Sequence, residues 1–188
     1  MPVEAELKAH VRNPDHVRKA LTMLSHEQVS VYRDTYLDLP DHSLDSAGRE
    51  LRIRLTEQAD STRCVLTYKD AAVHASGSKP EYETEVADAD TVLAILTTLG
   101  YIRLIAFTKY CRNYRFTRDG RDLLATLVYV PELDDTFLEI ETIVAETQEV
   151  DSALTVIRRI LADLSITETD LTKELYTDAV RERRQVSR

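Results

Sequence analysis

Strict alternation of apolar and polar residues runs from Val3 to Arg12 and constrains the fold of the whole chain. A period of two indicates a β-strand, because successive side chains of a strand point to opposite faces. The polar face carries Glu4, Glu6, Lys8, His10 and Arg12. Carboxylates suit Mg²⁺ or Mn²⁺, and a neighbouring lysine suits a phosphate, but a solvated antiparallel sheet shows the same pattern. The rest of the chain must distinguish these two interpretations.

Further segments with a period of two predict about eight strands in all. The other seven cover residues 28–38, 50–57, 63–69, 79–86, 103–116, 122–130 and 137–144. Apolar residues with helical spacing predict helices over 14–26, 88–99, 151–164 and 169–184. In the second of these helices, we expect Val92, Leu93, Leu96 and Leu99 to be buried. We also expect residues 70–78 to form a mobile loop.

The order of these elements predicts an α+β fold. Eight mostly sequential antiparallel strands can close into a β-barrel that has no free edges, with the helices flanking it. The length of 188 residues fits one domain, 1–188, with C-terminal helices from about 150–185. The apolar strand faces would then pack under the helices. The barrel interior would be a charged tunnel rather than an apolar core.

The charged residues of this tunnel alternate in sign along the chain. Acidic pairs, Glu4/Glu6 and Glu139/Glu141, lie near its two ends, and the basic residues lie between them: Arg52, Arg54, Lys69 and Lys109. Such a tunnel could hold a polyanion through the basic groups, with divalent cations bridging the glutamates to phosphates. The alternative is a set of weak cross-strand ion pairs on a solvated sheet.

Several short motifs, in order, resemble the CYTH superfamily, the triphosphate tunnel metalloenzymes. Glu4-Ala5-Glu6-Leu7-Lys8 resembles the family's Glu-x-Glu-x-Lys signature, and Phe137-Leu138-Glu139-Ile140-Glu141 resembles its closing Phe-x-Glu-x-Glu. Between them lie segments that resemble further strands of the family: Asp34-Thr35-Tyr36, Leu51-Arg52-Ile53-Arg54, Leu66-Thr67-Tyr68-Lys69 and the Glu81, Glu83, Glu85 series. The family includes class IV adenylyl cyclases and inorganic or thiamine triphosphatases.

This resemblance implies roles for individual residues. The divalent metals, Mg²⁺ or Mn²⁺, would be bound by Glu4, Glu6, Glu139 and Glu141. The triphosphate would be held by Lys8, Arg52, Arg54, Lys69 and Lys109, with Arg115 on the same strand face as Lys109. In triphosphatase-like relatives a lysine and a tyrosine act together at the reacting water, and Lys8 and Tyr36 stand at those places.

Two positions depart from the family pattern. Cys111 stands where an arginine is expected on the sixth strand, and Val128 stands where an aspartate is expected on the seventh. Losing a phosphate ligand and a metal-side carboxylate would match the charge of a transition state less well. These two departures therefore favour a slower enzyme or a module that binds its ligand without turnover.

Three functions remain open from the sequence. The first is a metal-dependent cyclase that converts ATP to cyclic AMP and pyrophosphate, since length and layout resemble the bacterial class IV enzymes. The second is an inorganic or organic triphosphatase; the absence of any tryptophan disfavours thiamine triphosphate because it removes a stacking partner. The third is a catalytically weakened module that binds triphosphate or polyphosphate.

The charge and hydropathy of the chain argue against nucleic-acid and membrane partners. The formal net charge of −9 argues against general nucleic-acid binding, which needs a basic surface. No signal peptide and no apolar run of membrane-spanning length is seen, so we expect a cytoplasmic protein with no membrane partner. The expected partner is a nucleoside triphosphate or inorganic triphosphate, and the sequence allows a homodimer.

Overall fold

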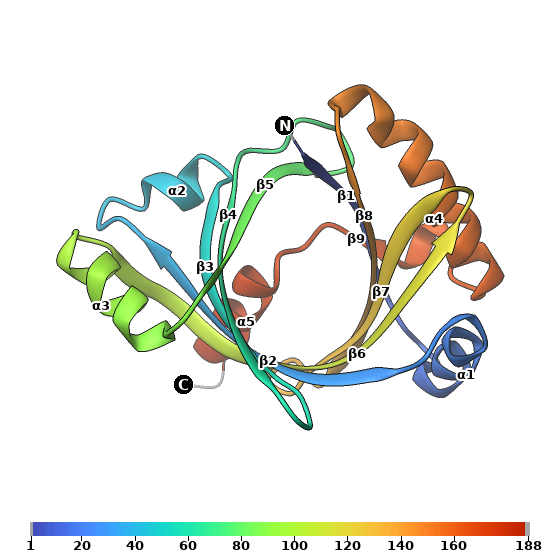
Figure 1. The fold of residues 1–188 in the computed structure, drawn as a ribbon, viewed down its shortest axis with the longest axis horizontal. Coiled ribbons are helices and arrows are strands. Elements are labelled where there is room, and N and C mark those ends of the chain that lie inside the picture. The colour runs from blue at the N-terminus through green and yellow to red at the C-terminus, as the bar shows by residue number, and fades with distance from the viewer. Residues whose placement is uncertain (1, 187–188) are drawn as a thin grey trace.

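The computed structural model describes residues 2–186, and strands dominate it (Figure 1). The strands are β1 Val3–His10, β2 Gln28–Asp38, β3 Glu50–Glu57, β4 Thr62–Lys69, β5 Lys79–Val86, β6 Ile102–Arg118, β7 Arg121–Val130, β8 Asp135–Val144 and β9 Leu171–Thr172. The α-helices are α1 Pro14–Leu24, α2 Ser43–Ser46, α3 Ala89–Thr98, α4 Val150–Asp163 and α5 Tyr176–Val186. No helix among these residues is long and apolar enough to span a membrane.

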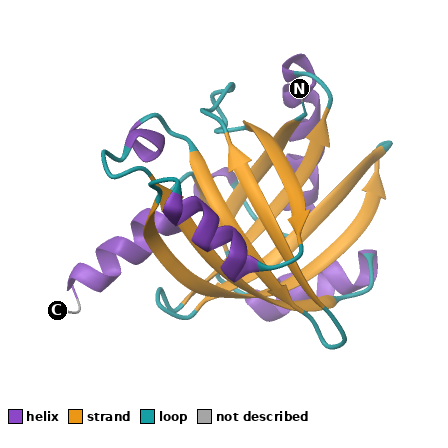
Figure 2. Cartoon of the chain, turned by 60° about the vertical axis from the view of Figure 1, so that its left-hand side comes forward, coloured by secondary structure: helices purple, strands orange, loops and turns teal. Residues whose placement is uncertain are grey.

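The strands form a closed barrel in the order β5-β4-β3-β2-β6-β7-β8-β1, and every pairing is antiparallel. Closure comes from two residue pairs between β1 and β5, Val3 with Pro80 and Glu4 with Lys79. Figures 1 and 2 show the ring of strands, and Figure 1 shows α1, α2, α3 and α4 outside it and α5 across one end. The predicted α+β fold, an eight-stranded antiparallel barrel with flanking helices, is confirmed.

The edge of β1 that faces away from β8 pairs with two different strands, each over two residues. Val3 and Glu4 pair with β5, whereas Lys8 and Ala9 pair with β9. The three residues between them, Ala5 to Leu7, pair with β8 on one edge and have no strand partner among residues 2–186 on the other. We call this interruption of the barrel wall the side window.

The main apolar core lies outside the barrel, between the outward face of β1 and its neighbours and helices α1 and α4. From β1 it takes Ala5, Leu7 and Ala9, as the alternation predicts. Helix α4 buries Leu154, Ile157, Ile160 and Leu161 on one face. Burial of these aliphatic side chains contributes about 1.5–3 kcal/mol each. Packing outside the barrel leaves the inward face of β1 free to carry charge.

The interior differs from the predicted fully charged tunnel. Inward-facing residues of β6, β7 and β8 form an apolar cluster with Tyr36 from β2 and Tyr176 and Val180 from α5. The chain reaches α5 by crossing one end of the barrel after β9 (Figure 1). Phe107 and Phe137 in this cluster are 5% and 3% exposed. The charged cavity therefore occupies only part of the interior.

Two helices also differ from expectation. The final helix begins at Tyr176 rather than 169, because residues 168–170 form a 3₁₀ turn closed by a Thr167–Asp170 capping box and β9 then pairs with β1. None of the four residues of α3 expected to be buried is fully buried: Val92, Leu93 and Leu96 are half-buried, and Leu99, which follows the helix end at Thr98, is 68% exposed. Gly100 has a φ of +100°, which redirects the chain at this helix end.

Candidate functional site

One cavity of about 810 Å³ opens from the barrel interior and contains most of the charged residues singled out from the sequence. Its lining includes Glu4, Glu6, Lys8, Tyr36, Arg52, Arg54, Lys69, Lys109, Glu139 and Glu141. They come from six strands, β1, β2, β3, β4, β6 and β8. The alternation in each strand turns them inward, and barrel closure brings them together.

Three carboxylates of the cavity converge. Glu4 and Glu6 come from β1, and Glu141 is the cross-strand partner of Glu6 on β8. Their ligand oxygens lie within 4.8 Å of one another. Burial, followed by the charges of Glu139 and Glu4, raises the pKa of Glu6 to about 8. Burial together with Glu4 and Glu6 also raises the pKa of Glu141.

This trio fits a divalent cation. Buried like charges disfavour the ionised form of each carboxyl, and a cation among them removes that penalty. An oxygen-only ligand set suits hard divalent cations. Glu139 lies beside the trio, opposite Lys8 in the β1–β8 ladder, so the structure gathers three of the four predicted metal ligands into one group.

Lys69 forms the boundary between the acidic trio and the basic side of the cavity. Its ammonium contacts Glu4 and lies 3.0 Å from Oε2 of Glu81 on β5. Burial lowers the pKa of Lys69, but the charges of Glu4 and Glu81 outweigh it and hold the pKa well above its usual value. Lys69 therefore stays charged, and Glu81, on the acidic fifth strand, is an added site residue.

Asp34 lies behind the basic residues. Its two carboxylate oxygens accept hydrogen bonds from Nε and Nη2 of Arg54 at 2.7 and 2.8 Å, and Nζ of Lys109 lies 3.4 Å from Oδ2. Burial opposes ionisation of Asp34, but the charges of Arg54 and Lys109 lower its pKa. Asp34 thus fixes two of the predicted phosphate ligands in place.

Arg52 is less fully satisfied. It is buried, its Nη2 donates to Oγ1 of Thr67 at 3.4 Å, and its Nε has no hydrogen-bond partner within residues 2–186. A buried donor without an acceptor is destabilising by about 1–3 kcal/mol. A phosphate oxygen in the cavity is the kind of acceptor that would satisfy it.

Lys8 meets a tyrosine that the sequence did not single out. Its ammonium lies 4.2 Å from the ring centroid of Tyr176 and donates to the backbone carbonyl of Glu174. The same ring lies 4.1 Å from the ammonium of Lys109. Burial lowers the pKa of Lys8, against the opposing charges of Glu139 and Glu6. Tyr36 also lines the cavity, stacked on Phe107 at 5.7 Å.

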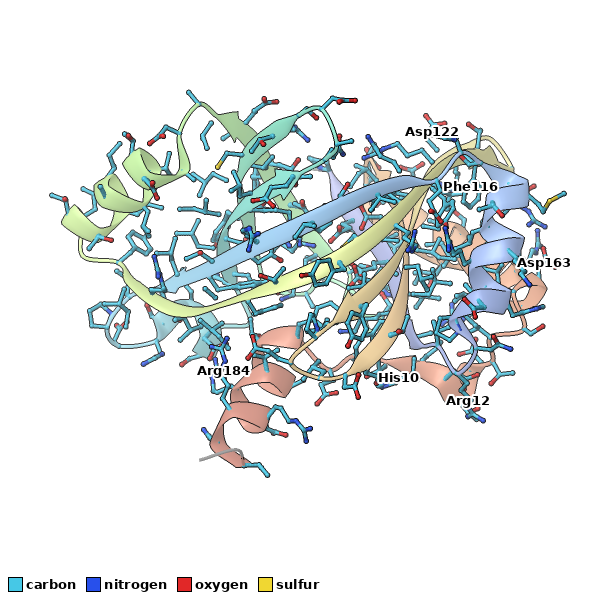
Figure 3. The ribbon with its side chains drawn as sticks, turned by 90° about the horizontal axis from the view of Figure 1, so that it is seen from below. His10, Arg12, Phe116, Asp122, Asp163 and Arg184 are labelled. Carbon is cyan, nitrogen blue, oxygen red and sulfur yellow. The ribbon has the colours of Figure 1, made fainter. Side chains whose placement is uncertain are left out.

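Two residues from the predicted charged faces lie elsewhere. Arg115 was expected to lie beside Lys109 at the triphosphate. It is instead exposed near the far end of the long strand β6 and does not line the cavity. His10, which is labelled in Figure 3, is the last residue of β1, away from Glu4 and Glu6, and its Nδ1 lies 2.9 Å from Oδ2 of Asp135. Strand length explains both cases, since a shared face does not imply a shared depth.

The residues that sequence reasoning missed are Asp34, Glu81 and Tyr176. Alternation put Asp34 and Glu81 on inward faces, but no local pattern indicates which residues they pair with. Tyr176 carries no local signal, because it faces the cavity only through the path of the chain between β9 and α5.

The two departures from the family pattern are direct neighbours. Cys111 on β6 pairs with Val128 on β7, and they are 1% and 0% exposed. Both belong to the interior apolar cluster. An apolar pair therefore occupies the positions where the family pattern has an arginine and an aspartate.

The chain is similar in sequence to known proteins. The CYTH domain matches residues 3–176. Adenylate cyclase CyaB of Aeromonas hydrophila is 27% identical over 124 residues, which cover 62% of this chain and 61% of that protein. The aligned region thus spans about three fifths of this curated relative.

Solved structures share the fold. The PH1819 protein of Pyrococcus horikoshii has a TM-score of 0.82 at 23% identity, with 96% of this chain and 99% of that chain covered. A candidate adenylate cyclase from Vibrio parahaemolyticus has a TM-score of 0.79 at 17% identity, covering 95% and 97%. A Hippeastrum protein, described as a candidate adenylyl cyclase with a dominant triphosphatase activity, has a TM-score of 0.69 at 18% identity, covering 97% and 96%.

Proposed function

The chain belongs to the CYTH family, and from this premise we propose that it is a divalent-metal-dependent enzyme that acts on a triphosphate inside the barrel. The preferred activity is that of a class IV adenylyl cyclase, which converts ATP to cyclic AMP and pyrophosphate. The observation that carries the proposal is the composition of one cavity. It holds the Glu4, Glu6 and Glu141 trio, facing buried basic groups that include an Arg52 Nε without an acceptor.

Basic residues of the cavity would bind the phosphates, and acidic residues would bind the metal. Arg52, Arg54, Lys69 and Lys109 would neutralise the phosphate oxygens, and Asp34 keeps Arg54 and Lys109 oriented. The acidic trio would hold Mg²⁺ or Mn²⁺, which would neutralise phosphate charge and polarise the reacting phosphorus–oxygen bond. Such preorganised charge stabilises the transition state of phosphoryl transfer.

In the cyclase reaction the ribose 3′ oxygen attacks the α-phosphorus, the bond to the β-phosphate breaks, and the 3′ proton must leave. Lys8 and Tyr36 are the proposed catalytic pair: they stand where triphosphatase-like relatives have a lysine and a tyrosine at the reacting water, and in a cyclase they would act on the 3′ hydroxyl instead. Both line the cavity, and burial lowers the pKa of Lys8, which favours a proton-accepting role.

A triphosphatase is the second candidate. The Hippeastrum relative, whose description reports a dominant triphosphatase activity, favours it. The same cavity would then hold the triphosphate while water attacks the terminal phosphorus. The apolar Cys111–Val128 pair favours the third candidate, a module that binds triphosphates with little turnover.

Product analysis of ATP, and separately of tripolyphosphate, with Mg²⁺ or Mn²⁺ tests the proposal. Cyclic AMP and pyrophosphate establish the cyclase; ADP and orthophosphate, or cleavage of tripolyphosphate, establish the triphosphatase. Binding of both ligands without any product indicates the binding module.

Site variants separate the barrel cavity from any contaminant. Glu6→Gln and Glu139→Gln should abolish metal-dependent tripolyphosphate binding in calorimetric titrations with Mn²⁺, with little effect on folding. Glu57→Gln is the matched control, because Glu57 is on β3 but pairs with Arg33 outside the cavity. Unchanged binding in both site variants would remove the basis for a tunnel site.

A further inference from the structure

The cavity does not end at the barrel wall. Its lining includes Glu4 and Glu6 inside the barrel, and also Leu7, Leu154 and Leu171, which belong to or pack against the outer core. The side window in β1, at Ala5 to Leu7, lies between these two sets of lining residues, and Leu7 itself lines the cavity. The barrel interior and the space outside β1 therefore form one continuous cavity.

We call the outer part the side chamber. It is lined by His74, Leu154, Arg158, Glu168, Leu171 and Lys173. These residues come from the β4–β5 loop, from α4, and from the segment that leads through β9 toward α5. Figure 1 shows this loop beside the N-terminal ends of β1 and α4.

Two contacts close the chamber on its outer side. Nε2 of His74 lies 3.1 Å from Oδ1 of Asp151 at the start of α4, and Nζ of Lys173 donates to the carbonyl of Ala75 at 2.5 Å. The loop predicted to be mobile is thus docked on both other walls of the chamber. The result is a partly enclosed space rather than an open surface.

The chemistry of the side chamber differs from that of the barrel. The barrel part is lined by clustered carboxylates and cations, whereas the chamber has an apolar floor of Leu154 and Leu171. Its polar side chains are already paired with protein groups: His74 with Asp151, Lys173 with the carbonyl of Ala75, and Nε of Arg158 with Oε1 of Glu168 at 2.9 Å. The apolar floor is therefore the surface left for a ligand, and an apolar surface flanked by polar groups is typical of sites for organic ligands.

The total volume of about 810 Å³ is in the range of sites that enclose a whole small organic ligand. A planar guanidinium such as that of Arg158 can stack on a base or donate to its edge. We propose that the side chamber binds the nucleoside of a nucleoside triphosphate, whose phosphates reach the barrel through the side window. This inference rests on the proposed function, and it favours nucleotides over inorganic triphosphate as the substrate.

The test compares two ligands that share the triphosphate and differ in the nucleoside. Affinities for ATP and for tripolyphosphate, each with Mn²⁺, are measured by calorimetry on the full chain. Arg158→Ala should weaken ATP binding about tenfold, the loss expected for one stacking or hydrogen-bonding contact, and leave tripolyphosphate binding within about twofold. Arg159→Ala is the matched control, because Arg159 is next on the same helix, pairs with Asp119 and lies outside the cavity.

A second variant separates recognition of the nucleoside from general attraction. Arg158→Lys keeps the positive charge but loses the planar group, so it should still weaken ATP binding. Equal weakening of both ligands, no weakening of either, or full rescue by lysine would each overturn the side-chamber proposal while the proposed function stands. A wild-type protein that binds neither ligand would overturn both.

Discussion

Replacing Asp34 with asparagine should destabilise the free protein and spare its affinity for a polyanion. The Asp34 side chain is fully buried, and it is the internal counter-ion of Arg54 and Lys109. Asparagine has nearly the same shape and still accepts one hydrogen bond, but it removes the negative charge. The variant therefore leaves two buried cations without their partner.

The magnitude follows from these contacts. Removing one member of a buried ion pair costs about 3–5 kcal/mol, because the remaining charge stays desolvated. The retained hydrogen bond to Arg54 puts the expected loss of unfolding free energy for Asp34→Asn at the lower end, about 3 kcal/mol. A typical domain has about 5–15 kcal/mol of stability, so the variant should still fold.

The pH dependence has a definite sign. The Arg54 and Lys109 charges, acting against burial, depress the pKa of Asp34 in the folded state. Its stabilising contribution is then complete above the unfolded pKa of about 3.9 and is lost as the pH falls through the folded value. The difference between wild type and variant should be constant near neutrality and shrink only in strong acid.

Urea unfolding at pH 7, with and without tripolyphosphate and Mn²⁺, measures both effects. The ligand should stabilise Asp34→Asn more than it stabilises the wild type, because the phosphates supply the missing negative charge. Asp38→Asn is the matched control: Asp38 is buried on the same strand but accepts hydrogen bonds from Leu39, Leu44 and Asp45, away from the cavity. A loss below about 1 kcal/mol, or a ligand affinity reduced as much as by Arg54→Ala, would refute this reasoning.

Three further predictions follow from the site. The pKa of Glu6 is raised to about 8, so the metal-free protein binds more protons when folded than when unfolded between about pH 4.5 and 8. Its urea midpoint should therefore fall as the pH rises over this range. Saturating Mn²⁺ should remove this pH dependence. Tyr176→Leu should lower the unfolding free energy by about 2–4 kcal/mol and weaken tripolyphosphate binding, whereas Tyr176→Phe, which keeps both ammonium–ring contacts, should change either quantity little. Cys111→Arg and Val128→Asp should each destabilise the protein but together lose less than the sum, and the double variant should turn over substrate faster; additive losses with unchanged turnover would contradict a paired origin of these two departures.

The Cys111–Val128 pair also bears on the choice between the proposed activities. Both side chains are uncharged and buried in the apolar cluster, so this pair cannot contact a phosphate or a metal with a charged group. Tyr176 from α5 joins the same cluster and contacts Lys8 and Lys109 from that side. The C-terminal segment is thus anchored in the same apolar cluster as Cys111 and Val128. The homodimer stays a prediction.

The sequence by itself determined the strands and their inward faces. A period of two has only two phases, so the residues on the charged face of β1 follow from the alternation, and the same holds for Arg52 and Arg54 on β3. The helices over 14–26, 88–99 and 151–164 were likewise predictable from apolar spacing. The face of a strand on which a residue lies and the apolar side of a helix depend on residues close together in the sequence, so sequence patterns predict both.

Only the tertiary structure decided which inward residues meet. Strand register and tilt placed Glu141 rather than Glu139 with Glu4 and Glu6, and left Arg115 beyond the cavity. The path of the chain after α4 brought Tyr176 to two lysines and opened the side window between β5 and β9. The physical reason is that alternation fixes the direction of a side chain but not its depth along the barrel axis. Depth depends on pairings between residues far apart in the sequence.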